Sequence, residues 1–330
     1  MVSTRNRESP DRLQATVVEC LRRHLSPHQR LSVGLSGGRD SVALLHAAHE
    51  LQTALNFRLD ACHVNHRLSA RSDRWQEFCG ELCDQLDVPL KIIAVDVSNS
   101  SRVGIEAAAR AERYAAFGGL VADWILLGQH RGDQAETVLF NLLRGTGLAG
   151  ASGMPQTRAM RPGLRLIRPL LGVARQDIND YLKKHDLKWV EDESNANTGF
   201  ARNFLRHEIV PALQSRFPAA EETLTAAAAR FAEALALLND LASLDLDGAP
   251  PNFPIPTAIL EKLTESRGRN LLRFLLVRHG VRIPSEARLI EALRQILYAG
   301  PDRHPAIDFG EWTLTRRGNE VYVDPCQGND

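Results

Sequence analysis

A short glycine-rich segment carries the residue types needed to hold a phosphate group. It reads Ser36-Gly37-Gly38-Arg39-Asp40-Ser41 and lies between an apolar stretch, 31–35, and an Ala/Leu-rich stretch that begins at Val42. Two glycines at a strand-to-helix turn let backbone N–H groups approach one anion closely. The serine hydroxyls add donors, and the Asp40 carboxylate can hold Mg²⁺ against phosphates. The segment predicts a phosphate or pyrophosphate site, although an ordinary strand-to-helix loop has a similar pattern.

Two further segments bring imidazole, amide and carboxylate side chains. His63-Val64-Asn65-His66 can bind a nucleotide base or a reacting group, whereas a zinc site there lacks a third ligand at a useful spacing. The segment 128–137 contains His130, followed by Asp133 and Glu136 in the first turn of a predicted helix. Asp133 is also a good helix N-cap, so capping is the alternative to a catalytic role.

The elements that carry these segments predict an α/β fold with a doubly wound parallel sheet. Apolar strand patterns alternate with helical patterns, which is typical of such sheets. The predicted strands are 31–35, 57–64, 90–97 and 124–128. Loops that follow parallel strands meet at one edge of the sheet. We therefore expect the segments 36–41, 63–68 and 128–134 to form one site.

Arginines offer positive charge at two places. Arg110 and Arg113 share one face of a predicted helix over 104–122, where they can compensate phosphate charge or form a solvated face paired with acidic neighbours. The segment 145–170 begins with glycines and continues with arginines, and we interpret it as a mobile, basic substrate loop for a polyanion. Its arginines are Arg158, Arg161, Arg165 and Arg168.

Composition predicts a soluble, cytoplasmic protein of two domains. The chain has 330 residues and no formal net charge, which argues against a general nucleic-acid binder. Its five cysteines fit free thiols in a reducing compartment. We see neither a signal peptide nor an apolar run long enough to cross a membrane.

The second domain is predicted to be smaller and mainly helical, with a short β tail. We place the catalytic domain at 1–217 and the second domain at 218–330, with a proline-rich linker over 245–257. The predicted helices are 219–242, 258–279 and 284–299, and short strands follow over 306–323. Gly318-Asn319 is typical of a hairpin turn between two of them.

Together these motifs resemble the tRNA(Ile)-lysidine synthetase family of PP-loop, N-type ATP pyrophosphatases. The resemblance covers roughly residues 28–217 strongly and 258–323 weakly. The segments that match are the PP-loop Ser-Gly-Gly-x-Asp-Ser at 36–41, His-Val-Asn-His at 63–66, Ala-Arg-x-x-Arg-Tyr at 109–114, 128–137, 144–150, Arg-Pro-Leu at 168–170, Asp-Glu-Ser-Asn at 192–195, and Arg-Asn-Phe-Leu-Arg-His at 202–207.

The resemblance implies a ligase that uses ATP and Mg²⁺. ATP would adenylate the wobble cytidine of a CAU-anticodon tRNA(Ile) and release pyrophosphate. L-lysine would then displace AMP at C2 and form lysidine. The partners are therefore tRNA(Ile) and L-lysine, without a membrane, and the resemblance leaves a homodimer possible.

The resemblance also implies roles for individual residues of this sequence. It assigns ATP binding to Ser36, Gly37, Gly38, Arg39, Asp40, Ser41 and Arg113. Asp40 and Asp133 would be catalytic and hold Mg²⁺. The residues implied to bind the base or the intermediate are His63, Asn65, His66, Arg110, His130, Glu136, Arg202 and Arg206. Those implied to contact tRNA are Arg144, Arg158, Arg161, Arg165 and Arg168.

This sequence departs from the family pattern at two positions, and three alternative functions remain open. Gln129 stands where the family often has histidine and Gly132 where it has Asp or Asn, so those two roles are not transferred. Many members of the family are longer, so we expect a natural short form or weaker binding of tRNA.

A PP-loop tRNA thiolase needs a cysteine persulfide or a Cys-x-x-Cys motif, and this sequence has no Cys-x-x-Cys. GMP synthetase needs a glutaminase or dimerisation module, and the third alternative is a catalytically silent nucleotide- or RNA-binding module.

Overall fold

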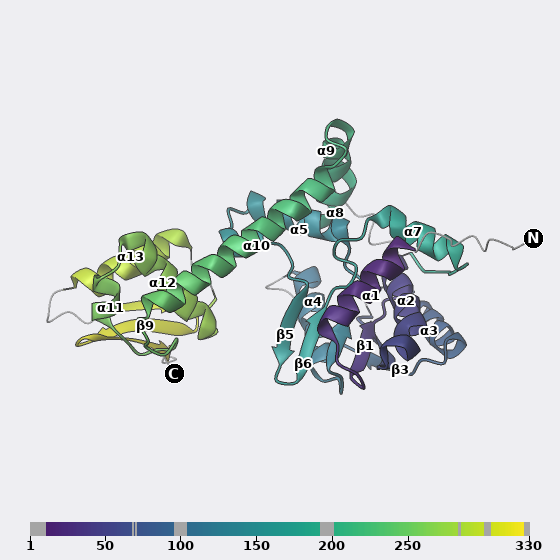
Figure 1. Ribbon diagram of the computed structural model, residues 1–330, viewed down its shortest axis with the longest axis horizontal. Helices are drawn as coiled ribbons and strands as arrows, with labels where there is room; N and C mark the ends of the chain where they lie inside the picture. Colours follow the sequence, from purple (N-terminus) through teal and green to yellow (C-terminus); the bar gives the residue numbers. More distant parts are fainter. Residues whose placement is uncertain are drawn as a thin grey trace, which may run out of the picture. The chain divides into compact units, whose positions relative to one another are not determined.

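The computed structural model describes most of the chain and divides it into two compact units (Figure 1). The described residues are 11–67, 69, 71–95, 104–191, 201–282, 285–299 and 305–326, with backbone alone at 105 and 106. The first unit is Met1–Ala229 and the second is Arg230–Asp330. The division falls within the helix α10 (Ala220–Asp245).

The first unit is built on a six-stranded, mainly parallel sheet with the order β3-β2-β1-β4-β6-β5. Its strands are β1 (Arg30–Gly34), β2 (Arg58–Asn65), β3 (Leu90–Ala94), β4 (Trp124–Leu126), β5 (Thr157–Arg161) and β6 (Leu164–Ile167). Only β5 runs antiparallel to its neighbour. The doubly wound α/β fold predicted from the sequence is therefore confirmed.

Helices cover both faces of this sheet, so its central strands are buried on both sides. One apolar core joins β1 to α1, α2, α3 and α7, and a second joins β4 and β6 to α4. The helices are α1 (Arg12–His24), α2 (Arg39–Leu55), α3 (Ser72–Gln85), α4 (Ile105–Gly118), α5 (Arg131–Leu143), α6 (Leu148–Ala151), α7 (Arg175–Lys184), α8 (Ala201–Phe204), the π-helical turn η2 (Leu205–Ile209) and α9 (Val210–Arg216).

The prediction of a mobile loop over 145–170 is wrong for its second half. Residues 157–167 form β5 and β6, and β6 pairs in parallel with β4. Leu164 and Leu166 are fully buried while Arg165 between them is exposed, which is the period of two expected of a strand. The arginines of this segment made its pattern resemble a basic loop, although apolar residues alternate with them.

The second unit packs the C-terminal part of α10 and the helices that follow it against a small antiparallel sheet with the order β7-β10-β9-β8. Its elements are β7 (Ile255–Pro256), α11 (Thr257–Glu261), α12 (Glu265–Arg278), α13 (Glu286–Tyr298), β8 (Ala306–Phe309), β9 (Trp312–Arg317) and β10 (Glu320–Pro325). The predicted hairpin is confirmed, since Arg317 pairs with Glu320 across Gly318, which has φ 59°. The single helix predicted over 258–279 is wrong, because Thr264 begins a new helix, α12.

Within the described ranges, no helix has both the length and the apolar character that a bilayer crossing requires.

Candidate active site

Three strand ends meet at one edge of the parallel sheet, as the sequence predicted. The His63 ring, near the end of β2, lies with Nδ1 2.9 Å from the carbonyl oxygen of Leu35, which follows β1. Gly128, which follows β4, lies against the start of α2. A Cβ atom at this glycine would be 2.9 Å from the backbone carbonyl of Asp40. The segments after β1, β2 and β4 are therefore neighbours in space.

The segment 36–41 forms a tight turn that caps α2. The hydroxyl of Ser41 donates to the carbonyl of Gly38 at 2.9 Å and accepts the backbone N–H of Ser36 at 3.2 Å. Gly37 has φ 81°, and a Cβ there would be 2.9 Å from Val190, whose backbone N–H donates to the Gly37 carbonyl. The turn thus needs glycine at this position, and it presents the N-terminus of α2, where an anion is favoured.

Asp40, in the first turn of α2, has an acceptor oxygen that no described group satisfies. Its Oδ1 is buried without a hydrogen-bond partner among the described residues. Burial raises the pKa of Asp40, and attraction to His130 opposes part of that rise. A carboxylate next to a phosphate-type turn is the ligand expected of Mg²⁺, which takes one or two carboxylates and completes its shell with phosphates and water. The donor set therefore fits that ion.

His130 and Asp133 form a capping box at the start of α5. The Asp133 carboxylate accepts the backbone N–H of His130 at 3.0 Å, and His130 Nδ1 accepts the N–H of Gly132 at 2.9 Å. Since Nδ1 accepts, the ring proton of the neutral imidazole lies on Nε2. That nitrogen lies 3.9 Å from Asp40 and 3.8 Å from Asp133. Asp133 therefore caps the helix and also lies beside His130, so capping does not exclude the catalytic role predicted for it.

Gln129 and Gly132, the two residues that depart from the family pattern, have local structural roles. Gly132 is buried, and a Cβ there would be 2.8 Å from the His130 ring, so glycine lets the imidazole fold back onto α5. The amide oxygen of Gln129 accepts a hydrogen bond from Arg168 at 2.8 Å.

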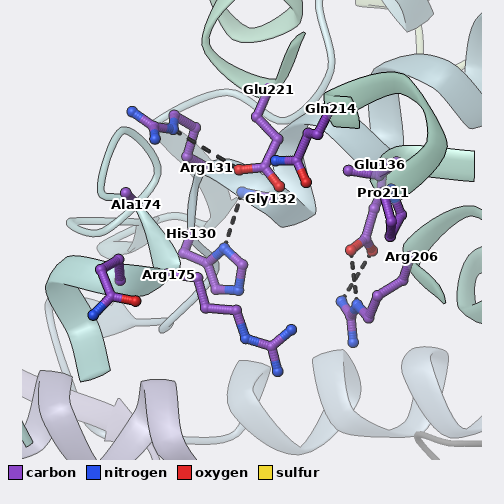
Figure 2. A pocket seen from close by; sticks show the side chains of 12 residues that line it. His130, Arg131, Gly132, Glu136, Ala174, Arg175, Arg206, Pro211, Gln214 and Glu221 are labelled. Atoms are coloured by element: carbon purple, nitrogen blue, oxygen red, sulfur yellow. Dashed lines mark hydrogen bonds and ion pairs between the residues drawn. The ribbon is translucent and has the colours of Figure 1, made fainter. Parts of the chain in front are cut away.

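Arg206 joins the site from a distant part of the sequence. Its guanidinium donates to Asp133 at 2.7 Å. It also donates to the two oxygens of Glu136 at 2.7 and 2.9 Å (Figure 2). Glu136 is 5% exposed, and burial raises its pKa while Arg206 opposes the rise. Arg206 itself lies in the π-helical turn η2, and no pattern in the sequence indicated that turn.

A pocket of about 340 Å³ opens beside this ion-pair cluster. Figure 2 shows His130, Glu136 and Arg206 on its wall together with Arg175 from the start of α7. Sequence analysis missed part of the lining, because these residues come from helices far apart in the chain and no motif marks them. The missed residues are Arg131, Ala174, Arg175, Gln176, Val210, Pro211, Gln214 and Glu221.

The histidines of the 63–66 motif are held neutral. Burial lowers the pKa of His63, although its hydrogen bond to the Leu35 carbonyl opposes this. Burial, with the charge of Arg113 second, lowers the pKa of His66 to about 4. Arg113 Nε lies 3.4 Å from His66 Nε2, so the predicted ATP-binding arginine lies beside this motif. Asn65 Nδ2 donates to Gln76 at 3.1 Å.

The arginines predicted to contact tRNA lie in different environments, as do Arg110 and Arg202, which were predicted to bind the base or the intermediate. Arg144 and Arg202 lie over the ring of Phe140, and Arg110 and Arg158 lie over Tyr114. Arg165 lies over Trp124. All of these are exposed except Arg202, which is half-buried.

Arg161 and Arg168, the other two arginines predicted to contact tRNA, donate hydrogen bonds to groups of the protein. Arg161 donates to the backbone carbonyls of Gly118 and Leu120 at 2.7 and 2.8 Å. Arg168 is only 2% exposed, so its side chain is buried within the first unit rather than presented at the surface where the sequence predicted a tRNA contact. The Asp-Glu-Ser-Asn motif at 192–195 lies outside the described residues.

Comparison with known proteins gives matches over both units. The model of a family described as PP-loop domain matches residues 8–213, and that of the TilS substrate binding domain matches residues 256–322. The chain is 42% identical to tRNA(Ile)-lysidine synthase of Nitrosomonas europaea, over 86% of this chain and 62% of that protein. It is 44% identical to that of Aromatoleum aromaticum, over 82% and 64%. The chain therefore spans less than two thirds of these two relatives.

A third relative is covered more fully. tRNA(Ile)-lysidine synthase of Alkalilimnicola ehrlichii is 40% identical over 94% of this chain and 71% of that protein. Among solved structures, the U34-tRNA thiolase NcsA from Methanococcus maripaludis with its [4Fe-4S] cluster matches with a TM-score of 0.59. That match has 17% identity and covers 67% of this chain and 78% of the thiolase, so it shows a shared fold alone.

Proposed function

Because this chain belongs to the tRNA(Ile)-lysidine synthase family, we propose that it joins L-lysine to C2 of the wobble cytidine in a CAU-anticodon tRNA(Ile). The observation that carries the proposal is the cluster of Asp40, His130 and Asp133 beside a turn suited to phosphates. The match to a substrate binding domain over residues 256–322 supports an RNA substrate.

The first step would activate the base. The cytidine O2 attacks the α-phosphorus of ATP, the bond to the β-phosphate breaks, and pyrophosphate leaves. Negative charge develops on the departing phosphates, so N–H groups of the turn and the start of α2 stabilise this step. Asp40 and Asp133 would hold Mg²⁺, which neutralises phosphate charge when bound.

The second step would form the new bond. A neutral amine of lysine attacks C2, and the C2–O2 bond breaks as AMP leaves with the former cytidine oxygen. The amine loses a proton, for which a carboxylate is a suitable acceptor. We expect this acceptor to be a carboxylate that is not bound to Mg²⁺ at that step rather than His130, because His130 Nδ1 already accepts the N–H of Gly132.

The proposal includes three further expectations. The reaction takes place in the cytoplasm, where tRNA and ATP are present. The exposed arginines over Phe140 and Tyr114 resemble the arginine and aromatic surfaces that bind unstacked RNA bases. A homodimer remains part of the proposal, and light scattering of the purified chain with and without tRNA tests it.

A thiolase is the second candidate because the fold is shared with NcsA. Sulfur transfer needs accessible thiolates. Cys20, Cys62, Cys79 and Cys83 are buried, and burial raises the pKa of each to about 11 or 12. Buried, protonated thiols are poor nucleophiles. The chemistry of these side chains therefore favours the ligase.

The test is incorporation of labelled lysine into a CAU-anticodon tRNA(Ile) transcript with ATP and Mg²⁺. Initiator methionine tRNA serves as the control substrate. The proposal expects incorporation into the first RNA only, with one AMP and one pyrophosphate released per lysine. Pyrophosphate release without incorporation would assign the site to another acceptor, and sulfur incorporation would favour the thiolase.

A further inference from the structure

Arg168 is a buried cation without a carboxylate among its hydrogen-bond partners in the described part of the chain. It is 2% exposed, and its guanidinium donates to three neutral oxygens. These are Gln129 Oε1 at 2.8 Å, the Pro155 carbonyl at 2.7 Å and the Tyr114 hydroxyl at 3.3 Å. Burial lowers the pKa of Arg168. Burying such a charge is costly, so the contacts it makes need a structural or functional reason.

The three partners come from three separate segments. Gln129 immediately precedes His130, which faces Asp40 and Asp133. Pro155 belongs to the turn before β5, and Tyr114 belongs to α4. The guanidinium therefore connects the segment that bears His130 to two other parts of the first unit.

A second interaction fixes the same two segments from the other side. The amide of Gln134 donates to the Met154 carbonyl at 3.0 Å and accepts the Met154 N–H at 2.8 Å. Residues 129 and 134 flank the capping box, and both are tied to the 154–155 turn. Without Arg168, the side chain of Gln129 would lose its hydrogen bond from the guanidinium, and the segment before His130 would lose that attachment to the rest of the unit.

The geometry points to Arg168 as a positioning residue that acts through Gln129 to fix His130 against Asp40 and Asp133. This role rests on the proposed function and replaces the tRNA contact expected from the sequence. An error of about 1 Å in the position of a reacting group can cost about 100-fold in rate. Arg168 would therefore affect the chemical step and leave RNA binding alone.

The test compares Arg168→Gln, Gln129→Leu and the double variant, with Gln29→Leu as the matched control. Gln29 is another glutamine whose side-chain oxygen accepts a side-chain hydrogen bond, from Trp124 Nε1 at 3.0 Å, and it lies outside the segment 128–134. For each protein one measures kcat for tRNA-dependent pyrophosphate release, the Kd for tRNA at several salt concentrations, and amide hydrogen exchange over residues 128–134.

We expect Arg168→Gln to lower kcat about 10- to 100-fold and to raise hydrogen exchange over 128–134. The tRNA Kd should change less than about twofold with the same salt slope, and Gln29→Leu should resemble the wild type in kcat and in hydrogen exchange over 128–134. The double variant should be no slower than the slower single variant, because both substitutions break one contact.

Two results would overturn the inference. A loss of tRNA affinity with a salt slope reduced by about 0.7 would identify Arg168 as a phosphate contact after all. Multiplicative effects of the two single variants would show that Arg168 does not act through Gln129. If Arg168→Gln does not fold, Gln129→Leu alone carries the test. If the wild type lacks activity, the proposed function fails, and hydrogen exchange still decides whether Arg168 fixes the segment.

Discussion

Asp40 is the residue on which the proposed chemistry depends most. It joins the phosphate-type turn to His130, and its unpaired Oδ1 is available to a cation. Asp40→Asn keeps the size of the side chain and removes its charge. We expect it to lower tRNA-dependent pyrophosphate release by about 100-fold or more, since charge stabilisation of this kind is worth about 3–4 kcal/mol.

The control for Asp40→Asn is RNA binding. The tRNA Kd should stay within about twofold of the wild type, because RNA affinity comes from basic and aromatic surfaces rather than from a carboxylate. Turnover equal to that of the wild type would remove Asp40 from the mechanism.

His66 makes stability depend on pH. Its folded pKa of about 4 lies below the ordinary value of 6.5, so the unfolded chain binds more protons between these values. Stability contributed by the neutral ring is therefore complete above about pH 6.5 and is lost as the pH falls toward 4. After allowance for solvent screening we expect a loss of about 1 kcal/mol at pH 5.

The measurement is urea unfolding of the wild type and His66→Gln at pH 7.5 and pH 5. The difference between the two proteins isolates this ring from the carboxylates that also titrate. A difference that does not change with pH would show that His66 is not held neutral by the fold.

Single residues also show what could be predicted from the sequence. Asp40, His63 and His130 could be placed together because each lies near or just after the end of a strand, and parallel strands end at one edge. Arg206 could be named from its motif, but its partners could not, because they depend on a π-helical turn. The burial of Arg168 could not be predicted, because a run of arginines does not reveal which of them is buried.

At the scale of elements, η2 explains how Arg206 reaches the site. Pro211 follows it at the start of α9 and has no N–H, so the regular hydrogen bonding of an α-helix cannot run through this position. The π-helical turn lies just before this proline, and such turns, although rare, are frequent at functional sites. The ion pairs of Arg206 with Asp133 and Glu136 then join this helix to α5.

The close approach of two elements at Gly128 gives another prediction. A Cβ at this position would be 2.9 Å from the Asp40 carbonyl and 3.1 Å from the Ser41 nitrogen, and backbone atoms cannot move aside cheaply. Gly128→Ala should push α2 away from the segment after β4. We expect a loss of about 1–3 kcal/mol in stability and at least about tenfold in kcat/KM.

The matched control is Gly80→Ala. Gly80 lies within α3, and nothing is found within 4 Å of a Cβ built there. Alanine in a helix interior should add about 0.5–1 kcal/mol to stability and leave turnover unchanged. Equal behaviour of the two variants in thermal unfolding and turnover would contradict the close approach at Gly128.

At the scale of the whole molecule, the absence of net charge matters most for RNA binding. The chain has 40 basic and 40 acidic residues, so no general field attracts a polyanion. Residues 1–217 contain 28 Lys and Arg against 24 Asp and Glu. Electrostatic affinity for tRNA must therefore come from local groups of exposed arginines.

The edge of the sheet formed by β5 and β6 separates such arginines from structural ones. Arg158 and Arg165 are exposed, whereas Arg161 donates to two backbone carbonyls of the fold. We expect the double variant Arg158→Gln/Arg165→Gln to weaken tRNA binding and to reduce its salt slope by about 1.4, or 0.7 per phosphate contact, while Tm is unchanged. Arg161→Gln should instead lower Tm, because two carbonyls lose their donor, and should leave the salt slope intact. An unchanged salt slope in the double variant would mean that this edge of the sheet does not contact the RNA backbone.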